Sequence, residues 1–184
     1  MFSSGFTNDM SSVYLDTNVI SGLAKGEYPE NISEALVHVT VLSKDGRINL
    51  YTSEITADEL ALIPARYRRQ HVVVYNLIKN VAQPAVLRVQ HQYFASSGRI
   101  FNRGRGLIVN SELIRELEAL IPTKKNPGEV LARSRDIAHL HRFRQSGLDY
   151  FLTEDRRSIL CHRDRLLELG IRVVSSIELL AELK

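Results

Sequence analysis

Short apolar runs alternate with longer amphipathic stretches along most of the chain. Apolar runs of strand length lie at residues 12–15, 48–52, 148–153 and 171–174. Spacing typical of helices is found over residues 19–25, 29–43, 64–80, 85–94, 111–121, 129–145 and 156–169, and in a last helix capped by Ser175. Strands that alternate with helices are typical of a parallel sheet covered by helices on both faces. The pattern therefore predicts an α/β fold.

Two central segments lack this periodicity. Residues 96–106 are rich in Gly and Arg, and residues 122–128 combine Pro, Lys and Gly, so we predict two basic loops. In the helix predicted over residues 64–80, four apolar residues are expected to face the interior: Val72, Val73, Leu77 and Ile78.

Carboxylates follow three of the predicted strands, at the point where each strand ends. Asp16 follows the first strand, Glu59 lies beyond the second, and Asp155 follows the strand over 148–153. Right-handed crossovers place the carboxyl ends of parallel strands on one edge of the sheet, which is where ligands bind. We therefore expect these three side chains to converge there.

Each of these carboxylates also has an ordinary structural interpretation. Asp16 and Asp155 stand where helix N-caps stand, and Thr56 and Glu59 have the spacing of a capping box. Two further carboxylates of the same segment compete with Glu59 for the role of site residue: Glu54 and Asp58.

A fourth carboxylate, Asp136, lies in the middle of the helix predicted over 129–145. A mid-helix Asp is unfavourable by propensity and costs more when it is buried, so we expect a compensating partner. A salt bridge to Arg133 or Arg135 is one interpretation, and membership of the acidic cluster is the other.

The other reactive residue types indicate no competing chemistry. His139 and His141 lie close to Asp136, but no set of His and Cys has the spacing of a zinc site, so we predict packing or surface roles for both. The single cysteine, Cys161, excludes an intrachain disulfide and fits a reducing compartment. Without a secretion signal or a run long enough to span a membrane, we expect a cytoplasmic protein with no membrane contact.

Arginine supplies most of the positive charge, and it is clustered. The formal net charge is +3 and the pI is about 9.1, with arginines gathered over residues 66–69, 99–105 and 133–144. The planar guanidinium suits phosphate oxygens, which favours an anionic partner.

Carboxylates held close together repel one another, so the predicted cluster needs a counter-charge. Oxygen ligands select a hard divalent cation, and we expect Mg²⁺ or Mn²⁺. Such an ion aligns a water molecule and stabilises charge on a phosphodiester, which is chemistry that a protein with an affinity for anions can use.

Four acidic segments occur in a fixed order: Leu15-Asp16-Thr17-Asn18, Thr56-x-x-Glu59, Asp136-Ile-Ala and Phe151-Leu-Thr153-Glu154-Asp155. In order and spacing they resemble the signatures of PIN-domain nucleases, a family that includes VapC-type toxins. The resemblance extends from Tyr14 to Val174. It implies a three-layer α/β/α sandwich with a central parallel sheet, and Mg²⁺- or Mn²⁺-dependent hydrolysis of RNA phosphodiester bonds by an endoribonuclease.

The resemblance also implies roles for individual residues. Four acidic residues match the catalytic and metal-ligating positions: Asp16, Glu59, Asp136 and Asp155. Three polar residues would support them through hydrogen bonds: Thr17, Asn18 and Thr153. We expect four arginines to hold the RNA backbone: Arg103, Arg105, Arg133 and Arg135.

We predict one PIN-like domain over residues 1–184, with residues 66–127 as an extended helical and basic-loop insertion that compact members of the family lack. The expected partners are RNA, a second copy of the chain in a homodimer, and an antitoxin protein if the chain is the toxin of a toxin–antitoxin pair. The insertion leaves the oligomeric state and the RNA target open.

Two other classes of function remain in competition. The chain is a PIN-like RNA- or protein-binding module without catalysis if no metal-dependent cleavage occurs. It is a receiver-type α/β domain if Asp16 accepts a covalent phosphate, although it has no Asp-x-Asp pair at the first strand and no lysine after a late strand.

Overall fold

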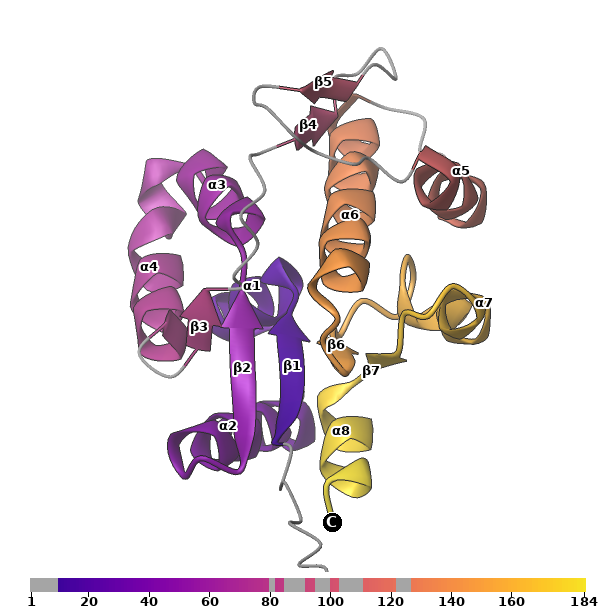
Figure 1. Ribbon diagram of the computed structural model, residues 1–184. Helices are drawn as coiled ribbons and strands as arrows, with labels where there is room; N and C mark the ends of the chain where they lie inside the picture. The colour runs from indigo at the N-terminus through magenta and orange to yellow at the C-terminus, as the bar shows by residue number, and fades with distance from the viewer. Residues whose placement is uncertain (1–9, 80–81, 85–91, 95–99, 103–110, 122–126) are drawn as a thin grey trace, which may run out of the picture.

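The computed structural model describes residues 10–79, 82–84, 92–94, 100–102, 111–121 and 127–184 (Figure 1). Its central sheet has five parallel strands in the order β3-β2-β1-β6-β7. These strands are β1 (Ser11–Leu15), β2 (Ile48–Thr52), β3 (Ala82–Pro84), β6 (Tyr150–Leu152) and β7 (Val173–Val174). The α/β class predicted from the alternation of elements is confirmed.

Helices fill most of the intervals between the strands. They are α1 (Thr17–Lys25), α2 (Glu30–Lys44), α3 (Glu54–Leu62), α4 (Ala65–Lys79), α5 (Ser111–Leu120), α6 (Pro127–Ser146), α7 (Arg163–Glu168) and α8 (Ser176–Glu182), with a 3-10 turn η1 (Leu160–His162) before α7. An antiparallel pair, β4 (Gln92–Phe94) with β5 (Ile100–Asn102), forms a second small sheet beside α6. Over the residues described, none of the helices combines the length and apolar character that a membrane span requires.

Strand β1 lies at the centre of the sheet, where the direction of chain winding changes. The chain moves outward from β1 to β2 and β3, and then returns to place β6 on the other side of β1. Val13 faces Leu50 of β2 on one side and Tyr150 of β6 on the other. In open α/β sheets the crevice for ligands forms at such a switch point, beyond the carboxyl ends of the strands. This edge therefore lies after β1 and β6.

Side chains that alternate along the strands fill two separate cores. On β1, Val13 and Leu15 pack into a core shared with α1, α2 and α8, while Tyr14 packs into a second core with α5, α6 and α7. Successive residues of a strand point to opposite faces, so both faces of the sheet need a helical layer. The result is a three-layer α/β/α sandwich (Figure 1).

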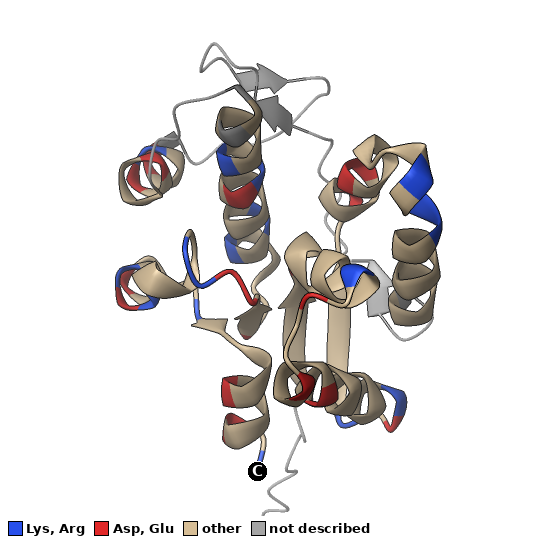
Figure 2. Ribbon diagram, turned by 180° about the vertical axis from the view of Figure 1, so that it is seen from behind, with Lys and Arg blue, Asp and Glu red and all other residues tan. Residues whose placement is uncertain are grey.

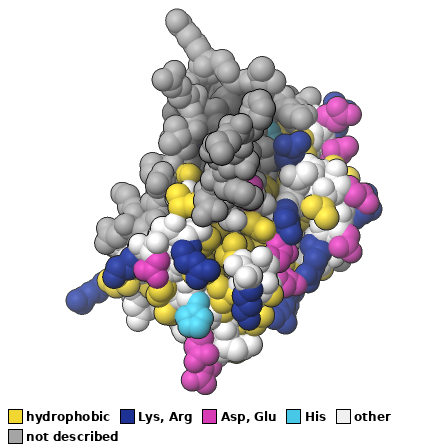
Figure 3. All heavy atoms as spheres, turned by 60° about the horizontal axis from the view of Figure 1, so that its bottom comes forward, with side chains coloured by type: hydrophobic (Ala, Val, Ile, Leu, Met, Phe, Trp, Pro, Cys, Tyr) yellow, Lys and Arg dark blue, Asp and Glu magenta, His cyan; other side chains and the backbone are white. Residues whose placement is uncertain are grey.

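Charged residues are distributed differently over two parts of the molecule. Basic residues recur along α6, and a short acidic segment follows β6 (Figure 2). At the opposite end, basic and acidic side chains are interspersed with hydrophobic ones (Figure 3). Arg172 forms an ion pair with Glu182 of α8 at 2.6 Å.

Several predicted elements are confirmed. The second strand has the predicted bounds, and helices occur at α2, α5 and α6 close to their predicted positions. Ser175 caps α8, and together with Glu178 it forms a capping box.

Other predictions were wrong. In α4, Val72 is 38% exposed, Val73 53% and Leu77 63%, and only Ile78 of the four residues expected inside is buried. The apolar residues of α4 are spread around most of its circumference, so the sequence pattern did not show which side of the helix faces the core. His71 is buried on that inner side.

Two predicted helices also differ from the structure. Residues 156–159 form a turn, because Ser158, Ile159 and Leu160 are buried one after another and do not follow a helical period. Of the helix predicted over 85–94, residues 92–94 form strand β4, and the remainder lies outside the described residues. The predicted basic loop over 96–106 contains strand β5 at residues 100–102. The rest of that loop and residues 122–126 of the second loop lie outside the described residues.

We expect Phe143→Ala to lower the free energy of unfolding by about 3–5 kcal/mol, because it removes a core aromatic side chain. Phe143 is 1% exposed and lies edge-on to Tyr14 and Phe151, with ring centroids 6.2 and 5.6 Å away. Urea unfolding measures the change. The control Leu167→Ala, at a side chain 58% exposed, should stay within about 0.5 kcal/mol of wild type. Equal losses in the two variants would contradict the assignment of the second core.

Candidate active site

Asp16 is the buried carboxylate at the end of the central strand. Its backbone N–H continues the sheet by donating to the carbonyl of Leu152 (3.0 Å), and its side chain is 5% exposed. Asp16 occupies the N-cap position of α1, but its side chain makes no capping hydrogen bond. The capping interpretation therefore does not account for the carboxylate.

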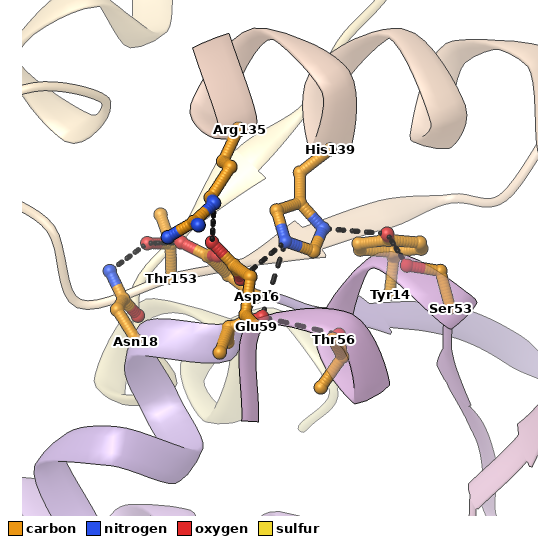
Figure 4. Close-up of polar contacts among 10 residues, drawn as sticks. Tyr14, Asp16, Asn18, Ser53, Thr56, Glu59, Arg135, His139 and Thr153 are labelled. Carbon is orange, nitrogen blue, oxygen red and sulfur yellow. Dashed lines mark hydrogen bonds and ion pairs between the residues drawn. The ribbon is translucent and has the colours of Figure 1, made fainter. Parts of the chain in front are cut away.

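Two polar residues predicted to support the site hold Asp16 in place (Figure 4). The hydroxyl of Thr153, at the end of β6, donates to Asp16 Oδ2 (2.7 Å). The side-chain amide of Asn18 donates to Thr153 Oγ1 (2.7 Å), and Asn18 Oδ1 accepts from the backbone N–H of Glu154 (3.3 Å). The loops after β1 and β6 are thus cross-linked around the carboxylate.

Glu59 reaches the same region from α3. Its Oε2 lies 3.0 Å from His139 Nε2, and its Oε1 lies 3.7 Å from Arg135 Nε. The predicted capping box is wrong, because α3 begins at Glu54 after Ser53 and so contains Thr56 within the helix. Thr56 is fully buried and accepts a hydrogen bond from Thr17 Oγ1 (3.3 Å), the third predicted supporting residue.

Among the competing carboxylates, Glu54 has a different role. It forms an ion pair with Arg142 of α6, whose side chain is 7% exposed. This pair joins the start of α3 to α6. Glu59 is therefore the carboxylate of α3 that contacts His139.

His139 is the residue of this site that the sequence analysis missed. It is 1% exposed, and its two ring nitrogens contact three side chains, one each from β1, α1 and α3. Nδ1 lies 2.8 Å from the Tyr14 hydroxyl, while Nε2 lies 3.0 Å from Glu59 and 3.2 Å from Thr17 Oγ1. The available signal was its position three residues after Asp136, which places both residues on one side of α6.

The protons of this network can be assigned from its donors and acceptors. Tyr14 has one hydroxyl proton, and its oxygen lies 2.6 Å from Ser53 Oγ, to which it donates. Tyr14 then accepts a hydrogen bond from His139 Nδ1–H, while Nε2–H donates to the carboxylate of Glu59. A doubly protonated His139 satisfies every contact.

The electrostatics agree with this assignment. Burial lowers the pKa of His139, but the hydrogen bond to Glu59 and the charges of Asp16, Glu59 and Asp136 raise it above the ordinary value. Burial raises the pKa of Glu59, but the hydrogen bond and charge of His139, with Thr17 and Arg135, hold it below the ordinary value. One buried cation and one carboxylate thus stabilise each other.

Asp16 is less well compensated than Glu59. Burial raises the pKa of its carboxyl group, and the charges of Glu59 and Asp155 raise it further. The charge of His139 and the hydrogen bond from Thr153 oppose this shift without cancelling it. The carboxylate of Asp16 is therefore the less well compensated of the two, mainly because it is buried.

Asp155 caps the turn over residues 156–159 and not the helix predicted to begin at Arg156. Its Oδ1 accepts hydrogen bonds from the backbone N–H groups of Arg157 and Ser158, each at 2.9 Å, as a capping residue does. Its charge also acts on Asp16, which places it near the same edge.

The remaining predicted residues are distributed unevenly. Asp136 is half-buried on α6, where its charge acts on His139. Arg133 donates to the backbone carbonyls of Ile121 (3.0 Å) and Glu118, so it secures the end of α5. Its role as an RNA contact stays a prediction. Arg103 and Arg105 lie outside the described residues.

The donor chemistry of the site fits a hard divalent cation in part. Its candidate ligands are carboxylate oxygens, and Mg²⁺ commonly binds through one or two carboxylates with several waters. The undercompensated charge of Asp16 is what such an ion would neutralise. However, among the residues that the structure describes, no three His, Cys, Asp or Glu side chains form a group that could hold a metal ion. The four-carboxylate cluster is thus not assembled there.

Comparison of the chain with protein-family models, with curated proteins and with solved structures finds no match.

We expect Asp16→Asn to raise the melting temperature in the presence of a chelator. The pKa of Asp16 is raised in the folded state, so the folded protein binds a proton more readily than the unfolded chain. The aspartate therefore destabilises the fold above the unfolded-state pKa of about 3.9, and this cost disappears as the pH falls below that value. At neutral pH the variant should melt about 2–4 °C higher, if the relief is near 1 kcal/mol.

Differential scanning calorimetry from pH 4 to 8 tests this expectation. The difference between variant and wild type should shrink toward pH 4. A variant that melts below wild type at neutral pH, or by the same margin at every pH, would contradict the assignment of an undercompensated charge to Asp16.

Proposed function

We propose that this chain is a divalent-metal-dependent ribonuclease of the PIN type. The observation that carries the proposal is the buried Asp16 carboxylate, which lies at the switch point of a parallel sheet, caps no helix and is undercompensated in charge. Carboxylates from α3 and from the loop after β6 act on it electrostatically. The choice of RNA as substrate, and a role as the toxin of a toxin–antitoxin pair, rest on the resemblance alone.

In this proposal Mg²⁺ or Mn²⁺ would bind at Asp16. The other three acidic positions, Glu59, Asp136 and Asp155, would have to move toward the ion to join it, because the described residues contain no assembled group of three ligands. When bound, the ion would supply a water of lowered pKa and stabilise negative charge on the scissile phosphate. Thr153 and Asn18 hold the Asp16 carboxylate in one orientation, which lowers the entropic cost of binding the ion.

Arg135 is the arginine best placed to contact the substrate. It lies beside Glu59 with its side chain 27% exposed, so its guanidinium combines a contact with the site and access to solvent. Exposed Arg156 and Arg157 follow Asp155 directly. Guanidinium groups at the rim of an acidic site would hold the phosphates on either side of the cleaved bond.

A second function has specific support. Glu59 is engaged by His139 and Arg135, and the described residues contain no assembled group of three metal ligands. A PIN-like module that binds RNA or a protein without cleaving it would have such a neutralised site. Direct measurement of metal-dependent cleavage separates the two functions.

We expect Asp16→Asn to reduce Mn²⁺-dependent cleavage of a mixed pool of single-stranded RNA by at least about 100-fold, because it removes a ligand from an ion worth several kcal/mol in the transition state. A chelator should abolish cleavage by the wild-type protein. Gel analysis of end-labelled RNA gives the rates, and circular dichroism verifies folding.

Asp164→Asn, at an exposed carboxylate of α7, is the matched control and should cleave like wild type. Cleavage that is unchanged in both Asp16→Asn and Asp136→Asn would refute the nuclease proposal. RNA binding without cleavage by the wild-type protein would favour the binding module.

A further inference from the structure

We propose that the pocket between the turn after β6 and the start of α8 is a subsite for one unpaired nucleobase of the RNA, with guanine as the best match. The inference rests on the proposed function only for the choice of RNA as ligand, and it requires no metal ion. The pocket has a volume of about 290 Å³ and is lined by Arg156, Leu160, Cys161, Arg163, Ser175 and Glu178. This volume lies at the lower end of the range for small-molecule sites, so it suits a single nucleobase.

The pocket lies at the same edge of the sheet as Asp16. Arg156 directly follows Asp155 in the loop after β6, and Ser175 directly follows β7. The acidic segment after β6 continues into a basic one that leads to α7 (Figure 2). An RNA strand bound at Asp16 can therefore extend into this pocket.

Hydrogen bonds hold the two walls of the pocket together. Glu154, in the loop after β6, accepts through Oε1 from the backbone N–H (2.8 Å) and the hydroxyl (2.6 Å) of Ser176 in α8. Among the lining residues, Leu160 and Ser175 are buried and form the inner surface. The pocket is thus formed before a ligand arrives, which lowers the cost of ordering it on binding.

One side of the pocket is a carboxylate held by the fold. Glu178 Oε2 accepts from the backbone N–H (2.9 Å) and the hydroxyl (2.8 Å) of Ser175, and Oε1 is paired with Arg163. Burial raises the pKa of Glu178, but the hydrogen bonds from Ser175, with the hydrogen bond and charge of Arg163, hold it below the ordinary value. The carboxylate is therefore ionised at neutral pH. It offers about four acceptor positions, so one remains open to a ligand.

Two guanidinium groups supply donors to the pocket. Arg163 uses Nε and Nη1 in contacts with the Leu160 carbonyl (3.3 Å) and with Glu178. Arg156 is exposed, and it forms no hydrogen bond or ion pair with the residues that the structure describes. Its whole guanidinium fork is therefore available to a ligand.

Guanine complements this combination of a guanidinium and a carboxylate. Its O6 and N7 are adjacent acceptors that match the fork of an arginine, here Arg156. Its N1–H is a donor for the open position on Glu178. Adenine presents a donor at N6 beside N7, so it cannot accept both N–H groups of the fork. A phosphate group would be repelled by the Glu178 carboxylate, which favours a nucleobase as the occupant.

The pocket also provides surfaces against which a planar nucleobase can lie. Unpaired RNA bases stack on the planes of Arg guanidinium groups. Leu160 adds an apolar side chain to the inner surface of the pocket. Both the faces and the edges of the nucleobase thus have partners.

The first test measures RNA binding in the presence of a chelator, so its result does not depend on a metal ion. Fluorescence anisotropy with the full chain compares a short labelled oligouridine with the same strand carrying one central guanine. We expect the guanine to tighten binding about 10-fold, the discrimination typical of one bidentate contact. Equal affinity for the two strands would overturn the inference.

The second test separates the guanidinium fork from its charge. Arg156→Lys keeps the positive charge but cannot make the bidentate contact, so the preference for guanine should fall to within about 2-fold. Arg165→Ala is the matched control, because Arg165 is exposed on α7, is paired with Glu168 at 3.6 Å and does not line the pocket. Its preference should stay at about 10-fold. A full preference in Arg156→Lys would contradict the assignment of Arg156.

The third test locates the bound nucleobase through Cys161, the one cysteine of the chain, which is exposed and lines the pocket. An excess of guanosine monophosphate should slow the alkylation of Cys161 by iodoacetamide, followed by mass spectrometry. Uridine monophosphate and inorganic phosphate should leave the rate unchanged. Protection by inorganic phosphate to the same extent would reveal an anion site and would overturn the nucleobase subsite.

The outcomes separate this inference from the nuclease proposal. Metal-dependent cleavage of RNA without a preference for guanine leaves the nuclease proposal standing and overturns the subsite. A preference for guanine with protection of Cys161, but without cleavage, supports the subsite and refutes the nuclease.

Discussion

The burial of a negative charge at the end of the central strand is the constraint on which the site depends. A carboxylate removed from water costs several kcal/mol unless hydrogen bonds or opposite charges compensate it. Asp16 is 5% exposed and receives a hydrogen bond from Thr153, but burial still raises its pKa. Keeping such a group charged at this edge of the sheet lowers the stability of the fold, and a bound cation can relieve that cost.

The remainder of the fold supplies partners to this edge from segments far apart in the sequence. Thr153 follows β6, Glu59 lies on α3, and His139 lies on α6. The parallel sheet makes the meeting possible, because each crossover returns the chain so that the next strand ends at the same edge. His139 has a double function, since it neutralises Glu59 and joins α6 to β1 and α3.

Much of this arrangement was predictable from the sequence, and the exceptions have physical causes. Asp16 and Asn18 follow one predicted strand and Thr153 is the last residue of another, so parallel topology alone brings them together. His139 could not be identified in this way, because its contacts depend on how α6 packs over the sheet, and a buried histidine has the same helical spacing as a packing residue. Because α3 begins at Glu54, Thr56 lies within the helix and does not form a capping box. Its hydroxyl instead accepts a hydrogen bond from Thr17. The apolar residues of α4 lie on several sides of the helix, so its inner face is defined only by packing against α1.

Anomalous diffraction from crystals soaked in Mn²⁺ tests the central claim most directly, because it locates the ion without relying on activity. The account predicts a peak within about 2.0–2.3 Å of an Asp16 carboxylate oxygen, with Glu59 in the same coordination sphere or joined to it through water. A crystal that takes up Mn²⁺ only elsewhere, with Asp16 still bound to Thr153 and no ion beside it, would contradict the account.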